Sequence, residues 1–248
     1  MSALYNVSDP VAQPSLAKRI AALDWAAAAR ALDDMGHAHV KGLLSAGECD
    51  EVAGWYDDAG RYRSTVAMSR HGFGQGEYKY FVYPLPCLVM ALRRLAYPHL
   101  AAVANHWAAL LGEARRYPDT LDGFSAECHA AGQLRPTPLV LRYAPGGYNR
   151  LHQDLYGDIA FPLQMAILLS EPGRDFEGGE FVLAEQRPRM QTRAEVVPLR
   201  QGDAVLFAVN ARPVKGTRGH YRARMRHGVS TVRSGQRTTL GIIFHDAR

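Results

Sequence analysis

The segment Leu151-His152-Gln153-Asp154 contains a histidine and an aspartate that are separated by one residue. Side chains alternate between the two faces of an extended strand, so His152 and Asp154 are expected to point to the same side. A second histidine, His227, ends another strand-like segment far downstream. Two histidines and one carboxylate on one side of a metal ion leave its opposite side open to other ligands. We therefore expect His152, Asp154 and His227 to form a metal site.

An arginine follows the second histidine at a fixed and informative spacing, since Arg237 lies ten positions after His227. Its guanidinium is a planar fork of donors that matches a carboxylate with two parallel hydrogen bonds. Thr239 lies two residues further along, on the same face of an expected strand, and can add a hydroxyl contact. The sequence therefore predicts a carboxylate-binding position beside the metal site.

In this order and spacing the residues resemble the Fe(II)/2-oxoglutarate-dependent dioxygenases, in which His-x-Asp is followed by a distant His and then by Arg or Lys. The resemblance extends from about residue 138 to 246, and the stretch from Tyr143 to His152 is similar to the corresponding segment of prolyl hydroxylases. It implies that His152, Asp154 and His227 bind Fe(II), and that 2-oxoglutarate is bound by Tyr143, Arg237 and Thr239. Dioxygen would be the second substrate, with ascorbate as a supporting reductant.

Other interpretations of these residues remain open at this point. Taken singly, each histidine fits an ordinary core or surface position, and Arg237 fits a solvated charge. Triads built from His129, His220 or His245 lack both the His-x-Asp partner and the trailing arginine. A non-enzymatic alternative is a cupin-like barrel that binds a ligand or a structural metal, although such a site has no need of a carboxylate fork.

The substrate is a separate question, on which the resemblances differ. The segments Leu151–Asp154 and Gly202–Phe207 are similar to AlkB-type alkylation-repair dioxygenases, although the terminal Arg-x-Asn-x-Thr-x-Arg motif of those proteins is missing. The C-terminal half as a whole resembles a bacterial oxygenase family regarded as acting on alkyl-damaged DNA. This resemblance implies oxidative dealkylation of damaged nucleic acid, and the alternatives are a peptidyl-prolyl or small-molecule hydroxylase.

The charge pattern agrees with a nucleic-acid partner. The formal net charge is +5, and basic residues gather before His227 and around residue 190. Such cations can bind phosphates, and exposed tyrosines can stack on bases of single-stranded or damaged nucleic acid. The cations expected to flank the mouth of the iron site are Arg187, Arg189, Lys215, Arg218, Arg222 and Arg224, with Tyr78, Tyr80 and Tyr156 as stacking surfaces.

The fold class follows from a change in hydrophobic period near Pro138. Before it, helical spacing predicts helices over residues 15–35, 45–55, 85–113 with a break at Pro98, and 121–131. After it, short apolar or alternating runs predict strands over residues 139–143, 163–169, 180–183, 196–199, 204–209, 221–229 and 238–244. We expect an α+β protein: a double-stranded β-helix, or jelly roll, with N-terminal supporting helices. A single domain would span residues 15–248, with helical support over 15–135, a catalytic core over 136–246 and a flexible arm over 1–14.

Four further expectations concern smaller features. A short strand is expected at residues 38–44, and residues 61–83 fit either a mobile ligand-gripping loop or an irregular hairpin with a charged face. Cys49, Cys87 and Cys128 are widely spaced and form no CxxC pair, which favours a reducing compartment. The sequence predicts no apolar run long enough to cross a bilayer, so we expect a cytoplasmic protein without membrane contact.

Overall fold

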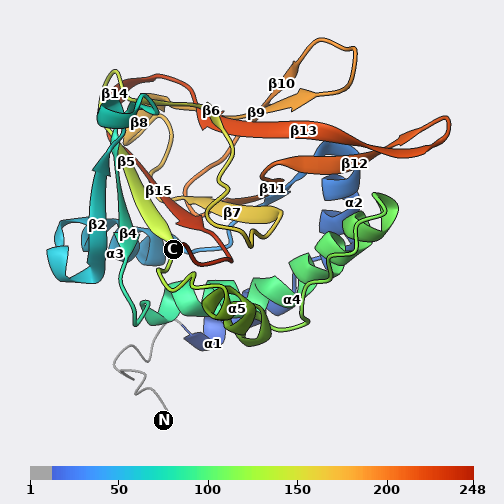
Figure 1. Ribbon diagram of the computed structural model, residues 1–248. Helices are drawn as coiled ribbons and strands as arrows, with labels where there is room; N and C mark the ends of the chain where they lie inside the picture. The colour runs from blue at the N-terminus through green and yellow to red at the C-terminus, as the bar shows by residue number, and fades with distance from the viewer. Residues whose placement is uncertain (1–12) are drawn as a thin grey trace.

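The computed structural model describes residues 13–248, so most of the arm expected at residues 1–14 lies outside the described residues. Two antiparallel sheets face each other, and helices cover the outer face of the larger sheet (Figure 1). This arrangement confirms the predicted α+β class and the double-stranded β-helix with supporting helices.

The larger sheet has seven strands and the smaller sheet has five in its main path. In spatial order the larger sheet contains β1 (His37–Val40), β11 (Ala204–Ala208), β7 (Leu163–Leu168), β15 (Arg237–Ile242), β5 (Leu139–Tyr143), β4 (Glu77–Phe81) and β2 (Tyr62–Ala67). The smaller sheet contains β10 (Arg193–Val197), β9 (Phe181–Gln186), β13 (Gly219–Val229), β6 (Tyr148–His152) and β3 (Gly74–Gln75), and β12 (Ala211–Gly216) pairs with β13. A separate pair joins β8 (Phe176–Gly178) and β14 (Val232–Gly235).

The alternation of side chains along the larger sheet separates two cores. On β15, Leu240 and Ile242 belong to the cluster shared with the helices, whereas Arg237 and Thr239 line a cavity between the two sheets. The same division holds on β11, where Leu206 faces the helices and Phe207 belongs to the inter-sheet cluster. Because strand side chains alternate with period two, one sheet can serve as a wall of the core and as the floor of a site.

The first helical segment differs from the prediction of one helix over residues 15–35. The structure has two helices, α1 (Gln13–Ala21) and α2 (Trp25–Met35). Asp24 separates them because its side chain accepts a hydrogen bond from the Ala27 backbone N–H and caps the second helix. Gly36 ends α2 in the left-handed conformation, which agrees with the predicted helix end at residue 35.

The helix predicted over residues 45–55 is α3 (Ala46–Gly54), and a capping box at Ser45 begins it. The Ser45 hydroxyl accepts from the Glu48 backbone N–H, and the Glu48 carboxylate accepts from the Ser45 backbone N–H at 2.8 Å. Arg19 from α1 also donates to both carboxylate oxygens of Glu48. The cap therefore joins the first and third helices.

We expect the substitution Ser45→Ala to lower the free energy of unfolding by about 1 kcal/mol, the usual contribution of such a cap. Urea denaturation monitored by circular dichroism measures this change. Thr120→Ala, which removes the hydroxyl cap of the separate helix α5 (Leu121–Ala130), provides a comparison of the same chemical kind. An unchanged urea midpoint for Ser45→Ala would show that water satisfies the backbone N–H group as well as the serine hydroxyl does.

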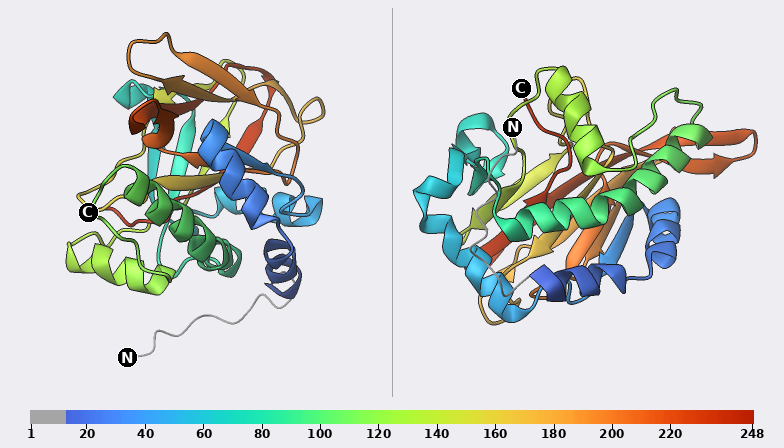
Figure 2. Two further views of the ribbon diagram at one scale, coloured as in Figure 1. Left: turned by 90° about the vertical axis from the view of Figure 1, so that its right-hand side faces the viewer. Right: turned by 90° about the horizontal axis from the view of Figure 1, so that it is seen from below.

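Helix α4 (Cys87–Leu110) corrects two expectations. It continues through Pro98 without a break, because apolar side chains before and after the proline pack into the same core. It also corrects the expectation about apolar runs, since its 24 residues and mean hydropathy of 1.2 are enough in length and composition to cross a membrane. The core helices of proteins outside membranes can have the same length and composition. In α4, 56% of the 18-residue apolar window is buried within the protein. Figure 2 shows α4 lying across the strands of the larger sheet.

The segment from residue 61 to 83 is a hairpin, the second of the two alternatives. Strands β2 and β4 pair with each other and β4 joins β5, so the hairpin extends the larger sheet. Between them lie a 3-10 turn at Met68–His71 and the short strand β3, which pairs with β6 of the smaller sheet. The segment expected to provide helical support thus also contributes strands to both sheets.

Several strand boundaries differ from the prediction. Residues 43–44 lie outside β1, and β10 occupies 193–197 instead of 196–199. The strands β8, β12 and β14 were not predicted, because they are short or contain polar residues and Pro213. Helix α5 (Leu121–Ala130) and β5 agree closely with the predicted ranges.

A buried polar network ties the segment after β15 to the helices. Arg93 of α4 and Asp246 are each 1% exposed and form an ion pair of 3.1 Å. Asp246 also accepts hydrogen bonds from Tyr83 and His129. Gln133, which is fully buried, donates to the backbone carbonyl of Asp246 at 2.5 Å. This network fixes the residues that follow β15 beneath the cavity.

Candidate active site

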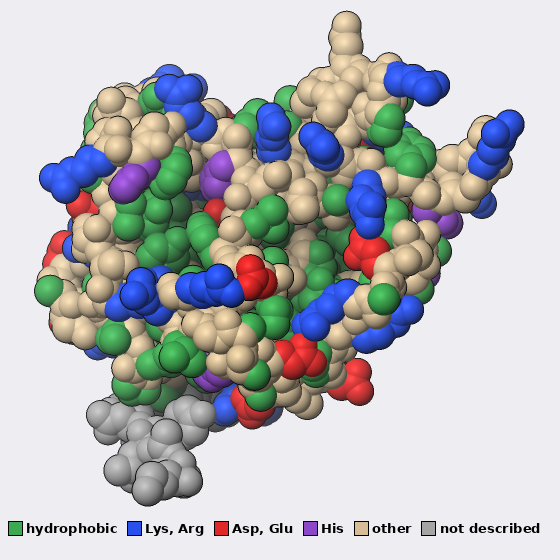
Figure 3. Space-filling view, in the orientation of Figure 1, with side chains coloured by type: hydrophobic (Ala, Val, Ile, Leu, Met, Phe, Trp, Pro, Cys, Tyr) green, Lys and Arg blue, Asp and Glu red, His purple; other side chains and the backbone are tan. Residues whose placement is uncertain are grey.

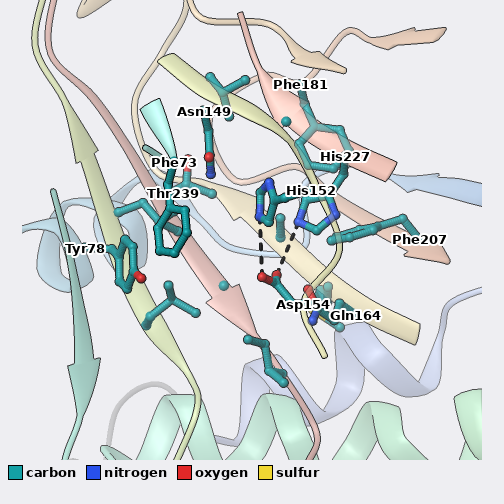
Figure 4. Close-up of a pocket in the computed structure, with 18 of the residues that line it drawn as sticks. Phe73, Tyr78, Asn149, His152, Asp154, Gln164, Phe181, Phe207, His227 and Thr239 are labelled. Carbon is teal, nitrogen blue, oxygen red and sulfur yellow. Dashed lines mark ion pairs between the residues drawn. The ribbon is translucent and has the colours of Figure 1, made fainter. Parts of the chain in front are cut away.

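Three side chains from two segments converge at one end of the inter-sheet cavity. His227 on β13 is the direct cross-strand partner of His152 on β6, and their ring centroids are 4.2 Å apart. Asp154 lies two residues beyond the end of β6, with Oδ1 3.4 Å from His152 Nε2 and Oδ2 3.3 Å from His227 Nε2. One candidate ligand atom from each residue lies within 4.8 Å of the others. Figure 4 shows the three side chains directed toward one another. The residues predicted as metal ligands are therefore close enough to hold one ion.

Hydrogen bonds hold the His-x-Asp segment in this position. His152 Nδ1 lies 2.7 Å from the Arg150 carbonyl oxygen, which requires Nδ1 to donate and leaves Nε2 free for a metal. The Gln153 amide donates to Asn210 Oδ1 and to the Met225 carbonyl oxygen, both at 2.8 Å. Gln153 thereby fixes the turn after β6. Because Asp154 lies outside the strand, strand alternation alone does not determine the direction of its side chain.

The pKa values of the three side chains are shifted by burial and by their closeness to one another. Burial would raise the pKa of Asp154, but hydrogen bonds and charge from both histidines hold that pKa well below its usual value. Burial lowers the pKa of His227, whereas the Asp154 carboxylate outweighs burial and raises the pKa of His152. An ionised carboxylate beside a neutral imidazole is the donor set that a divalent transition metal binds.

The second predicted group, Tyr143, Arg237 and Thr239, lies further inside the same cavity, which has a volume of about 200 Å³. Arg237 and Tyr143 are cross-strand partners on β15 and β5. The Arg237 Nη1 donates to Thr239 Oγ1 at 2.5 Å, and the guanidinium carbon lies 5.6 Å from the centre of the Tyr143 ring. The structure therefore brings the three residues together on one face of the larger sheet.

Arg237 is a buried cation without a close acidic partner. Its side chain is 1% exposed, and among residues 13–248 it forms no ion pair with an acidic residue, although the charge of Glu180 acts to raise its pKa. Burial lowers the pKa of Arg237 to about 10, so the guanidinium stays charged at neutral pH. Its Nε and the Tyr143 hydroxyl both lack a hydrogen-bond partner within this part of the chain. Buried charges are normally paired, so a ligand carboxylate would satisfy both groups.

Three further residues of the cavity were not predicted to contact the metal ligands or the co-substrate. Gln164 is buried beside Asp154, and its amide nitrogen lacks a partner among the described residues (Figure 4). Phe73, which is 47% exposed, lies across the cavity from the triad. Tyr156 donates to Asp154 Oδ1 at 2.8 Å. Gln164 could have been noticed in the sequence, because it is the one polar residue in the apolar run 163–168. The contact of Tyr156 with Asp154 depends on the conformation of the loop and has no such sequence signal.

The tyrosines expected to offer stacking surfaces divide into two kinds. Tyr78 and Tyr156 line the cavity. Tyr80 is buried, and the guanidinium of Arg63 lies 4.4 Å from the centre of its ring. Tyr80 therefore supports the wall of the cavity and offers no free face to a ligand.

The expectation that six cations flank the mouth of the site needs correction. None of them lines the cavity. Lys215 and Arg218 lie at the tip of the β12–β13 hairpin, about 25 Å from His227 at roughly 3.3 Å per strand residue. Arg187 is paired with Glu185. Arg189 lies on the loop between β9 and β10, in the left-handed conformation. Only Arg222 and Arg224 lie on β13 itself, and they belong to its exposed face.

The alternative histidine triads are not assembled. His129 and His245 serve the support beneath the site, since His129 Nε2 contacts Asp246 Oδ2 at 2.9 Å and His245 Nδ1 accepts from the Phe161 backbone N–H. His220 lies on the exposed part of the β12–β13 hairpin. Among residues 13–248, His152, Asp154 and His227 form the one cluster with metal-ligand geometry.

Comparison with known proteins gives two kinds of similarity. A protein-family model, Oxygenase-NA, described as "Oxygenase, catalysing oxidative methylation of damaged DNA", matches residues 76–247. Uncharacterized protein Rv2227 of Mycobacterium tuberculosis (strain ATCC 25618 / H37Rv) is 48% identical over 167 residues, which cover 67% of this chain and 72% of that protein. The residues matched by the family model include both candidate ligand segments and Arg237.

Two solved structures share the fold at low sequence identity. A Pseudomonas putida prolyl-4-hydroxylase gives a TM-score of 0.54 at 16% identity and covers 90% of this chain and 99% of its own. An oxidoreductase of the 2OG-Fe(II) oxygenase family from Burkholderia pseudomallei gives a TM-score of 0.50 at 17% identity, covering 91% of this chain and 94% of its own. Both comparisons support the double-stranded β-helix described above.

Proposed function

Since the chain belongs to the Oxygenase-NA family, described as oxygenases catalysing oxidative methylation of damaged DNA, we propose that it is an Fe(II)- and 2-oxoglutarate-dependent dioxygenase. His152, Asp154 and His227 would bind the iron. The observation that carries this proposal is that the three convergent ligands share one cavity with Arg237, a buried cation lacking a close acidic partner.

The chain's own residues would bind and orient the co-substrate. The distal carboxylate of 2-oxoglutarate would pair with the Arg237 guanidinium and with the Thr239 hydroxyl, and Tyr143 would donate from its hydroxyl. Burial raises the pKa of Tyr143 to about 12, so that hydroxyl keeps its proton at neutral pH. When bound, iron with 2-oxoglutarate and dioxygen supplies the oxidant for a substrate C–H bond, releasing succinate and CO2.

The walls of the cavity would protect this chemistry from water. Phe181 and Phe207 pack against the His227 ring, with centroids 6.2 and 4.6 Å away. Leu141 and Val229 also line the cavity. An apolar lining excludes solvent and strengthens the electrostatic contacts made by Arg237.

We propose that the substrate is an alkylated base in nucleic acid. Insertion of oxygen into a methyl C–H bond on a ring nitrogen gives an N-hydroxymethyl group. Its C–N bond then breaks, which releases formaldehyde and restores N–H on the base. Enzymes that act on a base take it out of the stack and hold it against aromatic or apolar side chains. Phe73 at the cavity and the exposed Leu151 and Leu155 beside the triad provide such surfaces.

A row of arginines on β13 offers a path for the phosphate backbone. Arg222, Arg224 and Arg226 are exposed and alternate with three buried residues, the last of which is His227. Neighbouring members of this arginine row are about 6.6 Å apart along the strand. Figure 3 shows basic side chains gathered over β13 beside a hollow that contains hydrophobic side chains and a histidine. Arg222 is also paired with Glu113, so Arg224 and Arg226 are the members with more freedom to bind phosphate.

A turnover assay tests the proposed reaction and substrate together. Protein with Fe(II), 2-oxoglutarate, oxygen and ascorbate should form succinate, and methylated single-stranded oligonucleotides should stimulate it with release of formaldehyde. Stimulation by a proline-containing peptide, without stimulation by any alkylated oligonucleotide, would replace the substrate proposal with a peptidyl-prolyl hydroxylase. The absence of succinate, together with a metal that resists exchange, would favour the cupin-like binding protein.

We expect the binding of single-stranded DNA to weaken steeply with salt, and the double substitution Arg224→Gln/Arg226→Gln to reduce that dependence. Each phosphate neutralised on a single strand contributes about 0.7 to the slope of log K against log salt, so the slope should fall by about 1.4. Fluorescence anisotropy between low and moderate salt measures it. Lys215→Gln/Arg218→Gln removes the same charge at the hairpin tip and should leave the slope unchanged. Equal effects of both double variants would contradict the arginine row as the binding path.

We also propose a cytoplasmic location. Cys49 and Cys128 are buried, Cys87 is half-buried, and none of the three forms a disulfide bond. Cysteines outside disulfide bonds are usual in compartments that keep thiols reduced.

A further inference from the structure

Asp154 lies on an irregular loop, yet its carboxylate must present one oxygen to an ion. Residues 153–160 contain no helix or strand, so no backbone ladder fixes the side chain. In the described geometry Oδ1 faces His152 and Oδ2 faces His227 at nearly equal distances. Rotation of the carboxylate would exchange these two atoms. A ligand on a loop therefore needs another contact to distinguish its oxygens.

The Tyr156 hydroxyl makes that distinction. It donates to Asp154 Oδ1 at 2.8 Å, two residues along the same loop. No hydrogen bond of this kind reaches Oδ2 from a tyrosine, serine or threonine in residues 13–248. Oδ1 thus has a fixed donor, while Oδ2 remains available to a metal ion. The interaction is the kind that orients ligands in metalloproteins from outside the coordination sphere.

Hydrogen bonds from Gln133 fix the backbone of the loop that carries Tyr156. The Gln133 amide nitrogen lies 3.3 Å from the Tyr156 carbonyl oxygen and 2.9 Å from that of Ile159, and the Ile159 backbone N–H donates to Gln133 Oε1 at 2.8 Å. Gly157 lies so close to Gln133 that an added Cβ would come within 2.5 Å of its Cδ. The Tyr156 ring also contacts Tyr80 edge-on, with centroids 6.3 Å apart. These contacts fix the hydroxyl relative to the buried support beneath the cavity.

We propose that Tyr156 is a positioning residue that holds Asp154 for coordination through Oδ2 alone, an inference that rests on the proposed metal site. Fixing one oxygen keeps the carboxylate from occupying two positions on the ion, which leaves three positions for 2-oxoglutarate and dioxygen. Without the hydroxyl, the carboxylate loses its donor and must be ordered by the metal itself. Partners of this kind typically change metal affinity or activity by 10- to 100-fold, as an order of magnitude.

The test measures binding of Mn(II) alone, by electron paramagnetic resonance, in addition to activity. Tyr156→Phe should raise the Mn(II) dissociation constant by about 10-fold or more. The KM for 2-oxoglutarate measured at saturating Fe(II) should stay near the wild-type value, because Arg237 is not altered. Saturating Fe(II) should also recover most of the succinate formation. A wild-type Mn(II) dissociation constant in Tyr156→Phe would overturn the proposal.

Tyr117→Phe provides the matched control. The Tyr117 hydroxyl donates to the Ala160 carbonyl oxygen at 3.2 Å, so this variant removes the same atom and one hydrogen bond from the far end of the same loop. Its Mn(II) affinity should equal that of the wild type, with similar thermal midpoints for both metal-free variants. An equal loss of Mn(II) affinity in both variants would assign the effect to the order of the loop and overturn the role of Tyr156. A wild-type protein that binds no Mn(II) would instead overturn the proposed metal site.

Discussion

Asp154→Ala should abolish Fe(II)-dependent conversion of 2-oxoglutarate to succinate, with a loss on the order of 10³-fold or more. Asp154 is the single carboxylate of the cluster, and without it two imidazoles alone would face a doubly charged ion. His152→Ala should have a comparable effect, because it removes the imidazole whose Nε2 is kept free by the Arg150 carbonyl. Succinate formed without a prime substrate is the measurement.

The control for this prediction comes from the same loop. Asp158 is exposed and paired with Arg248, so Asp158→Ala removes an identical group outside the cavity and should retain wild-type turnover. Binding of Mn(II) should be lost in Asp154→Ala and kept in Asp158→Ala. Full succinate formation by Asp154→Ala would remove the basis for the metal assignment.

Arg237→Ala should raise the KM for 2-oxoglutarate by roughly 100-fold, with a much smaller change in kcat at saturation. Removing one partner of a buried, hydrogen-bonded charge pair costs about 2–5 kcal/mol, and about 2.7 kcal/mol corresponds to 100-fold in affinity. Succinate formation across a range of 2-oxoglutarate concentrations separates the two constants. Arg233→Ala removes an exposed arginine from β14 and should leave both near the wild-type values.

A second co-substrate makes this prediction sharper. A 2-oxo acid that lacks the distal carboxylate has nothing to pair with the guanidinium, so wild type and Arg237→Ala should handle it with similar KM. If the variant instead loses affinity for both keto acids equally, Arg237 supports the cavity wall and does not recognise the distal carboxylate.

The sequence was informative wherever strand alternation and spacing determine which side chains meet. His152 and His227 are cross-strand partners, as are Tyr143 and Arg237, so two strand pairings assemble both halves of the site. The exposed arginines of β13 were equally readable, because their alternation with buried residues before His227 implies that they point away from it. Lys215 and Arg218 were expected near the site because the sequence does not show how far the β12–β13 hairpin extends from it.

Other features depend on contacts that no local pattern records. Asp154 lies beyond its strand, and its position relies on Gln153 and Tyr156, whose partners include residues from distant segments. Gln133 forms hydrogen bonds with the loop after β6, 23 to 26 residues away in sequence, and with Asp246, 113 residues away. Pro98 was expected to end a helix, but packing on both sides of it outweighs the loss of one backbone hydrogen bond.

The position of β15 has a consequence for synthesis of the protein. It follows all other described strands in chain order, yet it lies between β5 and β7 in the middle of the larger sheet. A chain emerging from the ribosome therefore holds two unpaired strand edges apart until residues 237–242 are made, and such edges pair readily with other chains. The same strand carries Arg237 and Thr239. Closure of the sheet and completion of the proposed co-substrate pocket are thus one event.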